Sequence, residues 1–192
     1  MKGFYFLVEE PSIKPVIECV VTNLLNLSAE DWFEIKIHQG KQDLKKALRD
    51  VIPTLSKIPN VRIMILHDQD NSDCNELKDE LLQELSNKCN CPFKVRIVCR
   101  ELESWFLGDM KALAKAYPGF NAENYENKAK FRSVDKIKNP SKELLSIISE
   151  YSGLLNLPKV KNAETVAPYL SLENNSISFK HFIDGIRELL HA

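Results

Sequence analysis

The chain has 192 residues, 44% of them hydrophobic, so it is long enough to bury the core of one globular domain. Its formal net charge of −1 excludes a protein-wide basic field, so contact with nucleic acid would need a local basic patch or a metal ion. The five cysteines lack regular spacing, and no apolar run is long enough to span a bilayer or form a secretion signal, so we expect a soluble cytoplasmic protein with reduced thiols and no membrane partner.

Strand and helix signals alternate in the first half of the chain. Short apolar or alternating runs predict four strands, at Gly3 to Val8, Phe33 to His38, Val61 to His67 and, within Pro92 to Cys99, at VRIVC (95–99). Apolar residues at helical spacing predict helices at Pro11 to Leu27, at Asp43 to Leu55, across Leu77 to Leu85 with Asn71 or Ser72 as N-cap, and from about Leu102 onward. This order predicts an α/β fold, a mostly parallel sheet flanked by helices.

The second half has a different character. Residues 117–139 are rich in lysine, asparagine, proline and glycine and show little periodicity, which predicts a long surface loop. Helices are predicted at Ser141 to Tyr151 and at Ser178 to Leu190, and Ser176 and Ser178 are candidates for an N-cap or for a phosphate contact. We therefore expect an α/β core in residues 1–116 and a lysine-rich loop with a C-terminal helical extension in residues 117–192, together forming one structural domain.

Acidic residues follow three of the predicted strands. Glu9 and Glu10 follow the first, Asp68 and Asp70 the third, and Glu101 and Glu103 the fourth. Since parallel strands present their carboxyl ends at one edge of a sheet, these side chains are expected to meet there, with Asp68 and Asp70 pointing the same way if the chain stays extended. Such carboxylates suit Mg²⁺ or Mn²⁺ and metal-assisted phosphodiester chemistry, although a solvated turn with a helix cap is the alternative.

Asp109 is a further acidic candidate. In a helix that starts near Leu102, it would lie on the same apolar face as Leu102, Trp105 and Phe106. A carboxylate on a core-facing stripe needs a partner, which could be a lysine of the chain or a metal ion, and the sequence leaves both open.

These landmarks resemble the Toprim-like domain of unknown function family 4276. The resemblance spans nearly the whole chain and is carried by five stretches: VEEPS (8–12), QGKQDL (39–44), HDQDNSDC (67–74), ELESWFLGD (101–109) and NNSISF (174–179). It implies a Toprim-like sheet and, from the wider Toprim group, a nuclease-like activity on DNA or RNA. It also implies a partnership with ABC-type ATPases in bacterial anti-phage defence.

The resemblance also implies roles for residues. Glu9 would take the general acid or base role, Asp68 and Asp70 would hold Mg²⁺ or Mn²⁺, and Glu103 and Asp109 would be further metal ligands. In Toprim proteins a glycine usually follows the catalytic glutamate, whereas here Glu10 and Pro11 follow Glu9. Proline has no N–H to offer a phosphate, so either Glu9 or Glu10 could be the working acid.

Basic residues cluster between residues 128 and 142. We expect this segment, with Phe131, to contact a nucleic-acid backbone, or to be a solvated loop, and the predicted nucleic-acid contacts are Lys41, Lys128, Lys130, Arg132 and Lys142. The functional hypothesis is a metal-dependent nuclease. The alternatives are a non-catalytic Toprim-like partner or regulatory subunit of an ATPase and, with weaker support, a small-molecule phosphatase, for which Ser72 is a poor match to the usual residue.

Overall fold

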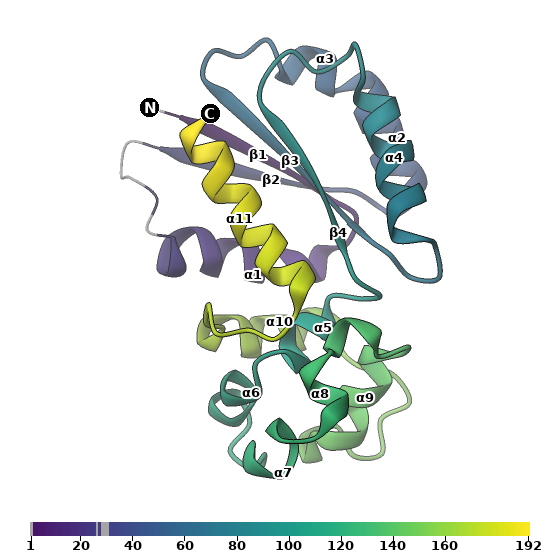
Figure 1. The fold of residues 1–192 in the computed structure, drawn as a ribbon, viewed down its shortest axis with the longest axis vertical. Coiled ribbons are helices and arrows are strands. Elements are labelled where there is room, and N and C mark those ends of the chain that lie inside the picture. Colours follow the sequence, from purple (N-terminus) through teal and green to yellow (C-terminus); the bar gives the residue numbers. More distant parts are fainter. Residues whose placement is uncertain (1, 26, 28–30) are drawn as a thin grey trace.

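A computed structural model describes residues 2–25, 27 and 31–192 of the chain. Its centre is a four-stranded, all-parallel sheet with the spatial order β2-β1-β3-β4 (Figure 1). The strands are β1 (Gly3–Val8), β2 (Trp32–Ile37), β3 (Val61–Asp68) and β4 (Phe93–Val98). The predicted α/β class with a parallel sheet and a C-terminal helix is confirmed, and each predicted strand agrees with the observed one to within two residues at either end.

The two central strands are buried on both faces. Every residue of β1 and of β3 is buried, as expected for continuous apolar runs such as FYFLV and IMIL. Residues 4, 6 and 64 face one apolar cluster, whereas residues 5, 63 and 65 face the other. Because side chains alternate along a strand, the sheet divides the protein into two cores.

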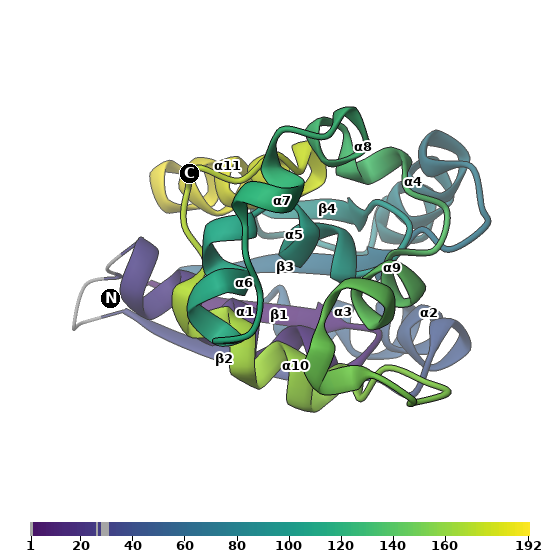
Figure 2. The ribbon, with the colours of Figure 1, turned by 90° about the horizontal axis from the view of Figure 1, so that it is seen from below.

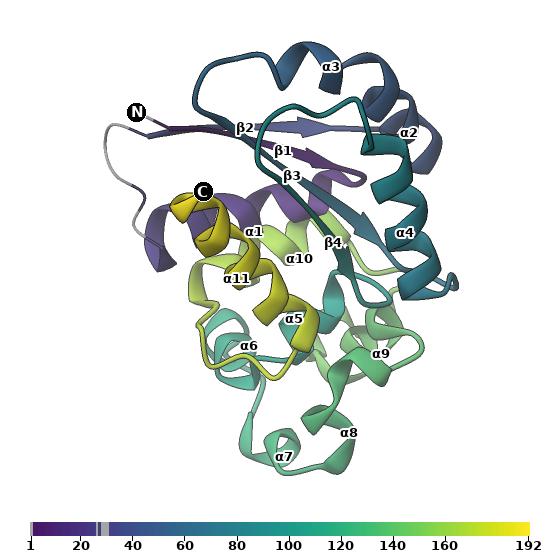
Figure 3. The same cartoon turned by 45° about the horizontal axis from the view of Figure 1, so that its top comes forward.

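Three helices cover one face of the sheet (Figure 3). They are α2 (Lys41–Asp50), α3 (Ile52–Leu55) and α4 (Cys74–Leu85). The single helix expected from Asp43 to Leu55 is wrong, because the chain breaks at Val51, two residues before Pro53, which has no N–H and whose ring crowds the preceding turn. The cap predicted for α4 is also wrong, since Asp73 accepts hydrogen bonds from the N–H groups of Asn75 and Glu76.

The other face packs against α1 (Lys14–Cys19) and α11 (Ile177–His191). The helix predicted from Pro11 to Leu27 is present as a 3-10 turn (Pro11–Ile13), α1 and a π-helical turn (Val20–Leu24), and its residue 26 lies outside the described residues. Helix α11 lies along β4 and begins at Ser176, whose hydroxyl accepts from the N–H of Phe179, which confirms the predicted cap.

A group of short helices covers the carboxyl ends of the strands (Figures 1 and 2). They are α5 (Glu103–Leu107), α6 (Met110–Ala116), α7 (Glu123–Glu126), α8 (Ala129–Arg132), α9 (Pro140–Ile147) and α10 (Lys159–Val166). Short 3-10 turns accompany them at Val134–Lys136, Ser149–Tyr151 and Ala167–Tyr169. In the described part of the chain, no helix has the length and apolar character needed to cross a membrane.

The surface loop predicted for residues 117–139 is wrong. Phe120, Phe131, Val134 and Ile137 are all buried, and they join the same apolar cluster as α5 and α11. The last three follow one another at intervals of three, which is the spacing of a single helical turn. Turns this short do not produce the long periodic pattern from which a helix is usually predicted.

The strand order fixes where a ligand site would form. Strand β1 lies between β2 and β3, so the connections that leave β1 and β3 run to opposite sides of the sheet. Ligands of open α/β sheets bind in the crevice at such a switch point, outside the carboxyl ends of the strands. Glu9 and Glu10 leave β1 at this point, and Asp68 ends β3 beside them.

Candidate functional site

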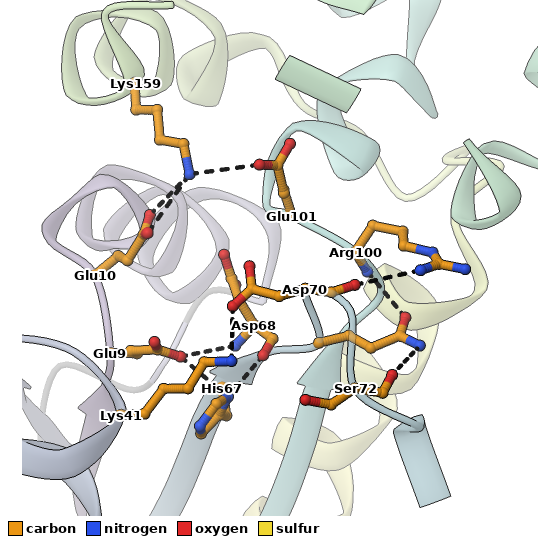
Figure 4. A network of polar contacts seen from close by, with 11 residues as sticks. Glu9, Glu10, Lys41, His67, Asp68, Asp70, Ser72, Arg100, Glu101 and Lys159 are labelled. Atoms are coloured by element: carbon orange, nitrogen blue, oxygen red, sulfur yellow. Dashed lines mark hydrogen bonds and ion pairs between the residues drawn. The ribbon is translucent and has the colours of Figure 1, made fainter. Parts of the chain in front are cut away.

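Carboxylates from three strand ends lie near one another, and Lys159 pairs with two of them, Glu10 and Glu101 (Figure 4). We call this group the acidic centre, and it consists of Glu9, Glu10, Asp68, Glu101, Glu103 and Lys159. Sequence reasoning identified the acidic residues, since each follows a strand, but it did not identify Lys159. The acids that follow β1, β3 and β4 interact with one another, because Glu10 and Glu103 both raise the pKa of Asp68.

Glu9 is held against the end of β3. Its Oε2 lies 3.0 Å from Nδ1 of His67 and accepts a hydrogen bond from the N–H of Asp68 at 3.3 Å. His67 Nδ1 also lies 2.7 Å from the carbonyl oxygen of Asp68, which fixes the ring orientation. Glu9 and His67 are both buried, so these contacts hold the Glu9 carboxylate in one orientation.

Glu10 turns away from Glu9 and faces the short helices. Its carboxylate lies 3.4 Å from Nζ of Lys159 and accepts a hydrogen bond from the hydroxyl of Ser12 at 3.3 Å. The two glutamates that the sequence could not separate therefore have different surroundings. Glu9 is buried beside His67, whereas Glu10 is partly exposed beside Lys159.

Burial makes two of the carboxylates unusually weak acids. Desolvation raises the pKa of Asp68 well above its ordinary value, and the neighbouring Glu10 and Glu103 raise it further. Desolvation also raises the pKa of Glu103 to about 7, although Lys159 opposes this shift. Groups like these favour a nearby cation, because a positive charge is what stabilises their ionised form.

Glu103 has no hydrogen-bond partner among the described residues. It is 0% exposed, and both of its carboxylate oxygens are buried and unpaired. Buried polar atoms are almost always hydrogen-bonded, so two orphaned oxygens on one side chain require an explanation. Lys159 supplies long-range attraction to Glu103, but no ion pair within 4.0 Å joins them in the described structure.

Lys159 is the cation of the acidic centre. It lies at the start of α10, 3.4 Å from the Glu10 carboxylate and 3.9 Å from Glu101. Burial alone would lower the pKa of Lys159, but Glu103, Glu10 and Glu101 together raise it. The signal that could have found this helix is the apolar spacing of residues 163, 166 and 167 after Pro158.

Asp70 does not continue the strand as the sequence suggested. The residue has a φ of 50°, in the left-handed region, and its N–H donates to the carbonyl of Arg100 at 2.8 Å. The expectation that Asp68 and Asp70 point the same way along extended chain is therefore wrong. The Asp70 carboxylate instead forms an ion pair with Lys41 at 2.8 Å (Figure 4), which joins a predicted metal ligand to a predicted nucleic-acid contact.

Asp109 lies at a helix start rather than within a helix. The helix expected to run on from Leu102 is wrong, because it ends at Leu107 and a second helix begins after Asp109. The Asp109 carboxylate accepts hydrogen bonds from the N–H of Ala112 at 2.9 Å and from the N–H and hydroxyl of Ser171 at 2.9 and 2.8 Å. Its partners are thus two backbone N–H groups and a serine hydroxyl rather than a lysine, so Asp109 is not part of the acidic centre.

Four of the five predicted basic contacts lie on and around α8 and α9. Lys128 lies 4.5 Å from the centre of the Tyr125 ring, and Arg132 donates to the carbonyl of Asn127 at 3.0 Å. Lys130 pairs with Glu143, and Lys142 is exposed. Lys41 belongs to a different part of the surface, where it meets Asp70.

The donor atoms of the acidic centre suit a divalent metal ion. Its carboxylate oxygens are the donors that Mg²⁺ and Mn²⁺ prefer. The two oxygens of Glu103 accept no hydrogen bond from the described residues, so they are available to coordinate a metal ion. Within residues 2–25, 27 and 31–192, however, no three histidine, cysteine or acidic side chains converge closely enough to hold a metal ion. The donor chemistry fits, while two of the carboxylates, Glu10 and Glu101, are already paired with Lys159.

The fold and the site define an α/β protein with an acidic centre at the switch point of a parallel sheet. The chain belongs to the domain of unknown function family DUF4276, whose family model matches residues 8–187. No curated protein and no solved structure matches the chain.

Proposed function

We propose that the chain is a Mg²⁺- or Mn²⁺-dependent, nuclease-like protein that cleaves phosphodiester bonds at the acidic centre. The observation that best supports this proposal is Glu103, whose two buried oxygens have no partner among the described residues. Next to it, Asp68 has a raised pKa that a bound divalent cation would reverse. The switch-point location adds support, since ligands of α/β sheets bind there.

Each residue of the acidic centre has a role in this proposal. Asp68, Glu103 and Glu10 would hold the metal ion, which when bound would act as a Lewis acid on a phosphate oxygen. Glu9, held by His67 and by the N–H of Asp68, is the best-oriented proton acceptor. Lys159 keeps a positive charge among the carboxylates, where it balances the negative charge that a phosphate would bring.

The order of acids along the chain supports a Toprim-like relationship as part of the same proposal. A glutamate follows β1, an Asp-x-Asp pair spans the end of β3, and further acids follow β4. The substrate would then be DNA or RNA. An ABC-type ATPase partner, a role in anti-phage defence and a cytoplasmic location are further parts of this proposal.

The second candidate is a non-catalytic partner subunit with a Toprim-like scaffold. The observation that favours it is Lys159, whose ammonium group already forms ion pairs with Glu10 and Glu101. Carboxylates that already pair with a lysine of the chain can be stable without a metal ion.

Calorimetry with Mn²⁺ and Mg²⁺, combined with plasmid nicking on the same samples, separates the two candidates. The wild-type chain is compared with Asp68→Asn and Glu103→Gln, which keep the side-chain shape and remove the charge. Glu123→Gln on α7 is the matched control, because Glu123 is exposed and lies outside the acidic centre. We expect the two site variants to lose metal affinity by more than about tenfold and to lose nicking, while the control keeps both.

Each other outcome has a definite meaning. If the wild-type chain binds no divalent metal, the nuclease proposal is rejected and the partner-subunit candidate stands. If metal binds but all three variants bind it equally well, the ion is held elsewhere and the acidic centre is not the site.

A further inference from the structure

A surface pocket of about 670 Å³ lies between α8 and α9. Its basic residues are Lys130, Lys136, Lys138 and Lys142, and we call it the lysine pocket. The remaining wall includes Ala129, Ile137 and the polar side chains of Ser133, Asn139 and Ser146. A volume of this size lies within the range of pockets that hold small organic ligands or single nucleotides.

The lysine pocket carries an uncompensated positive charge. Its one acidic residue is Glu143, which is paired with Lys130. Lys136, Lys138 and Lys142 are exposed and make no ion pair within 4.0 Å among the described residues. The nearby Asp135 is engaged elsewhere, since its carboxylate accepts from the N–H of Ser178 and the hydroxyl of Ser176. Three unpaired lysines around one cavity, in a chain of net charge −1, favour a polyanionic ligand.

The lysine pocket is joined to the acidic centre by Glu101. Ser141 lies between Lys138 and Lys142 in sequence, and its N–H and hydroxyl donate to Glu101 Oε2 at 3.1 and 2.6 Å. The other oxygen of Glu101 lies 3.9 Å from Lys159. Direct contacts therefore lead to the acidic centre from Ser141, the neighbour in sequence of the pocket residue Lys142 (Figure 4 shows the Glu101 and Lys159 end).

We propose that the lysine pocket binds the phosphates of a single-stranded nucleic acid and leads the strand toward the acidic centre. This inference rests on the proposed function for the destination of the strand, while the binding itself does not depend on cleavage. A concave pocket admits the backbone of a single strand, whereas a duplex presents a convex surface. Phe131 is buried against Tyr125 and cannot stack on a base, so recognition uses phosphates and tolerates any sequence.

The test measures binding of a fluorescein-labelled, mixed-sequence 20-mer, as DNA and as RNA, by anisotropy in EDTA. The triple variant Lys136→Ala/Lys138→Ala/Lys142→Ala is compared with Lys46→Ala/Lys57→Ala/Lys115→Ala, which removes the same charge from exposed lysines outside the pocket. We expect the pocket variant alone to lose at least about tenfold in affinity at 0.1 M salt. Its slope of log affinity against log salt should fall by about 2, at roughly 0.7 for each lost phosphate contact.

The outcomes separate this inference from the proposed function. If the wild-type chain binds the 20-mer, the pocket variant does not, and no metal condition gives nicking, then the strand-binding pocket is supported and the nuclease proposal is rejected. An equal loss of affinity for the 20-mer in both triple variants would show a general charge effect and overturn the inference that the lysine pocket is the binding site. Displacement of the 20-mer by equimolar ATP would also overturn it, because the pocket would then be a small-nucleotide site. Absence of wild-type binding overturns it outright, and thermal melting of both variants confirms that they fold.

Discussion

Two buried carboxylates, Asp109 at the N-cap of α6 and Glu103 at the start of α5, have opposite surroundings. Asp109 is 4% exposed and accepts three hydrogen bonds, whereas Glu103 is 0% exposed and accepts none from the described residues. The first carboxylate has all the partners that a structural role requires. The second carries the desolvation cost of a buried acid without the hydrogen bonds that normally offset it. Burial of an acid is therefore a poor guide to function unless its hydrogen bonds are counted.

The largest effect that tests this comparison is expected at Asp109. Asp109→Ala removes a helix cap and leaves the N–H groups of Ala112 and Ser171 without an acceptor. We expect the free energy of unfolding to fall by about 4 kcal/mol, since hydrogen bonds to a charged group contribute about 1.5–3 kcal/mol each and are not additive. Urea denaturation measures this, with Asp73→Ala as the control, an exposed N-cap whose loss should cost about 1 kcal/mol.

The next effect is the pH dependence caused by Glu103. Its folded-state pKa is raised to about 7 from an ordinary 4.5, so the folded protein holds this proton over a range in which the unfolded chain releases it. The contribution of Glu103 to wild-type stability is therefore fully present below pH 4.5 and is lost as the pH rises through 7. The glutamine of Glu103→Gln does not titrate, so the variant lacks this pH dependence. From pH 5 to pH 8 in EDTA, we expect the variant to gain about 2–3 kcal/mol relative to wild type. A difference that stays constant with pH would place Glu103 in the same structural class as Asp109.

Removal of the internal cation is expected to have an intermediate effect. Lys159→Met leaves Glu10, Glu101 and Glu103 without their nearest positive charge. Breaking a fully buried pair costs about 3–5 kcal/mol, and the side chain of Lys159 is 32% exposed, so we expect about 2 kcal/mol in EDTA. Thermal melts with and without 5 mM Mn²⁺ extend the test. Mn²⁺ should raise the melting temperature of the variant more than that of the wild type. Equal shifts in melting temperature would argue against the acidic centre as the metal site.

The smallest effect on stability is expected at Asp70. Both side chains of its ion pair with Lys41 are exposed to solvent, so Asp70→Asn should change the free energy of unfolding by less than about 1 kcal/mol. If Asp70 is a metal ligand as the sequence suggested, calorimetry should show weaker Mn²⁺ binding in this stable variant. Unchanged metal affinity would restrict the ligand set to Asp68, Glu10 and Glu103.

The sheet and its acidic edge were predictable because each depends on a strong local signal. Runs such as FYFLV and IMIL are typical of central parallel strands buried on both faces, and acids that follow such strands emerge at the same edge of the sheet. Ser176 was found in the same way, because a serine before an apolar helix is a typical N-cap.

The parts that the sequence did not predict depend on contacts between distant segments. Lys159 is one of many lysines, and only the packing of α10 beside the strand ends makes it the partner of Glu10. Asp109 and Ser171 are 62 residues apart, so no local pattern shows that one binds the other. The left-handed backbone at Asp70 is set by its hydrogen bond to Arg100, which belongs to another loop.

The turns after β3 and β4 are tied together by their backbones. The N–H of Gln69 donates to Val98, that of Asp70 to Arg100, and the side chain of Gln69 accepts from the N–H of Arg100. Arg100 also has a left-handed φ of 63°, so each turn depends on the other for its shape. For protein engineering, the two turns form a single transplantable module, and a graft that replaced either one alone would lose the geometry of both.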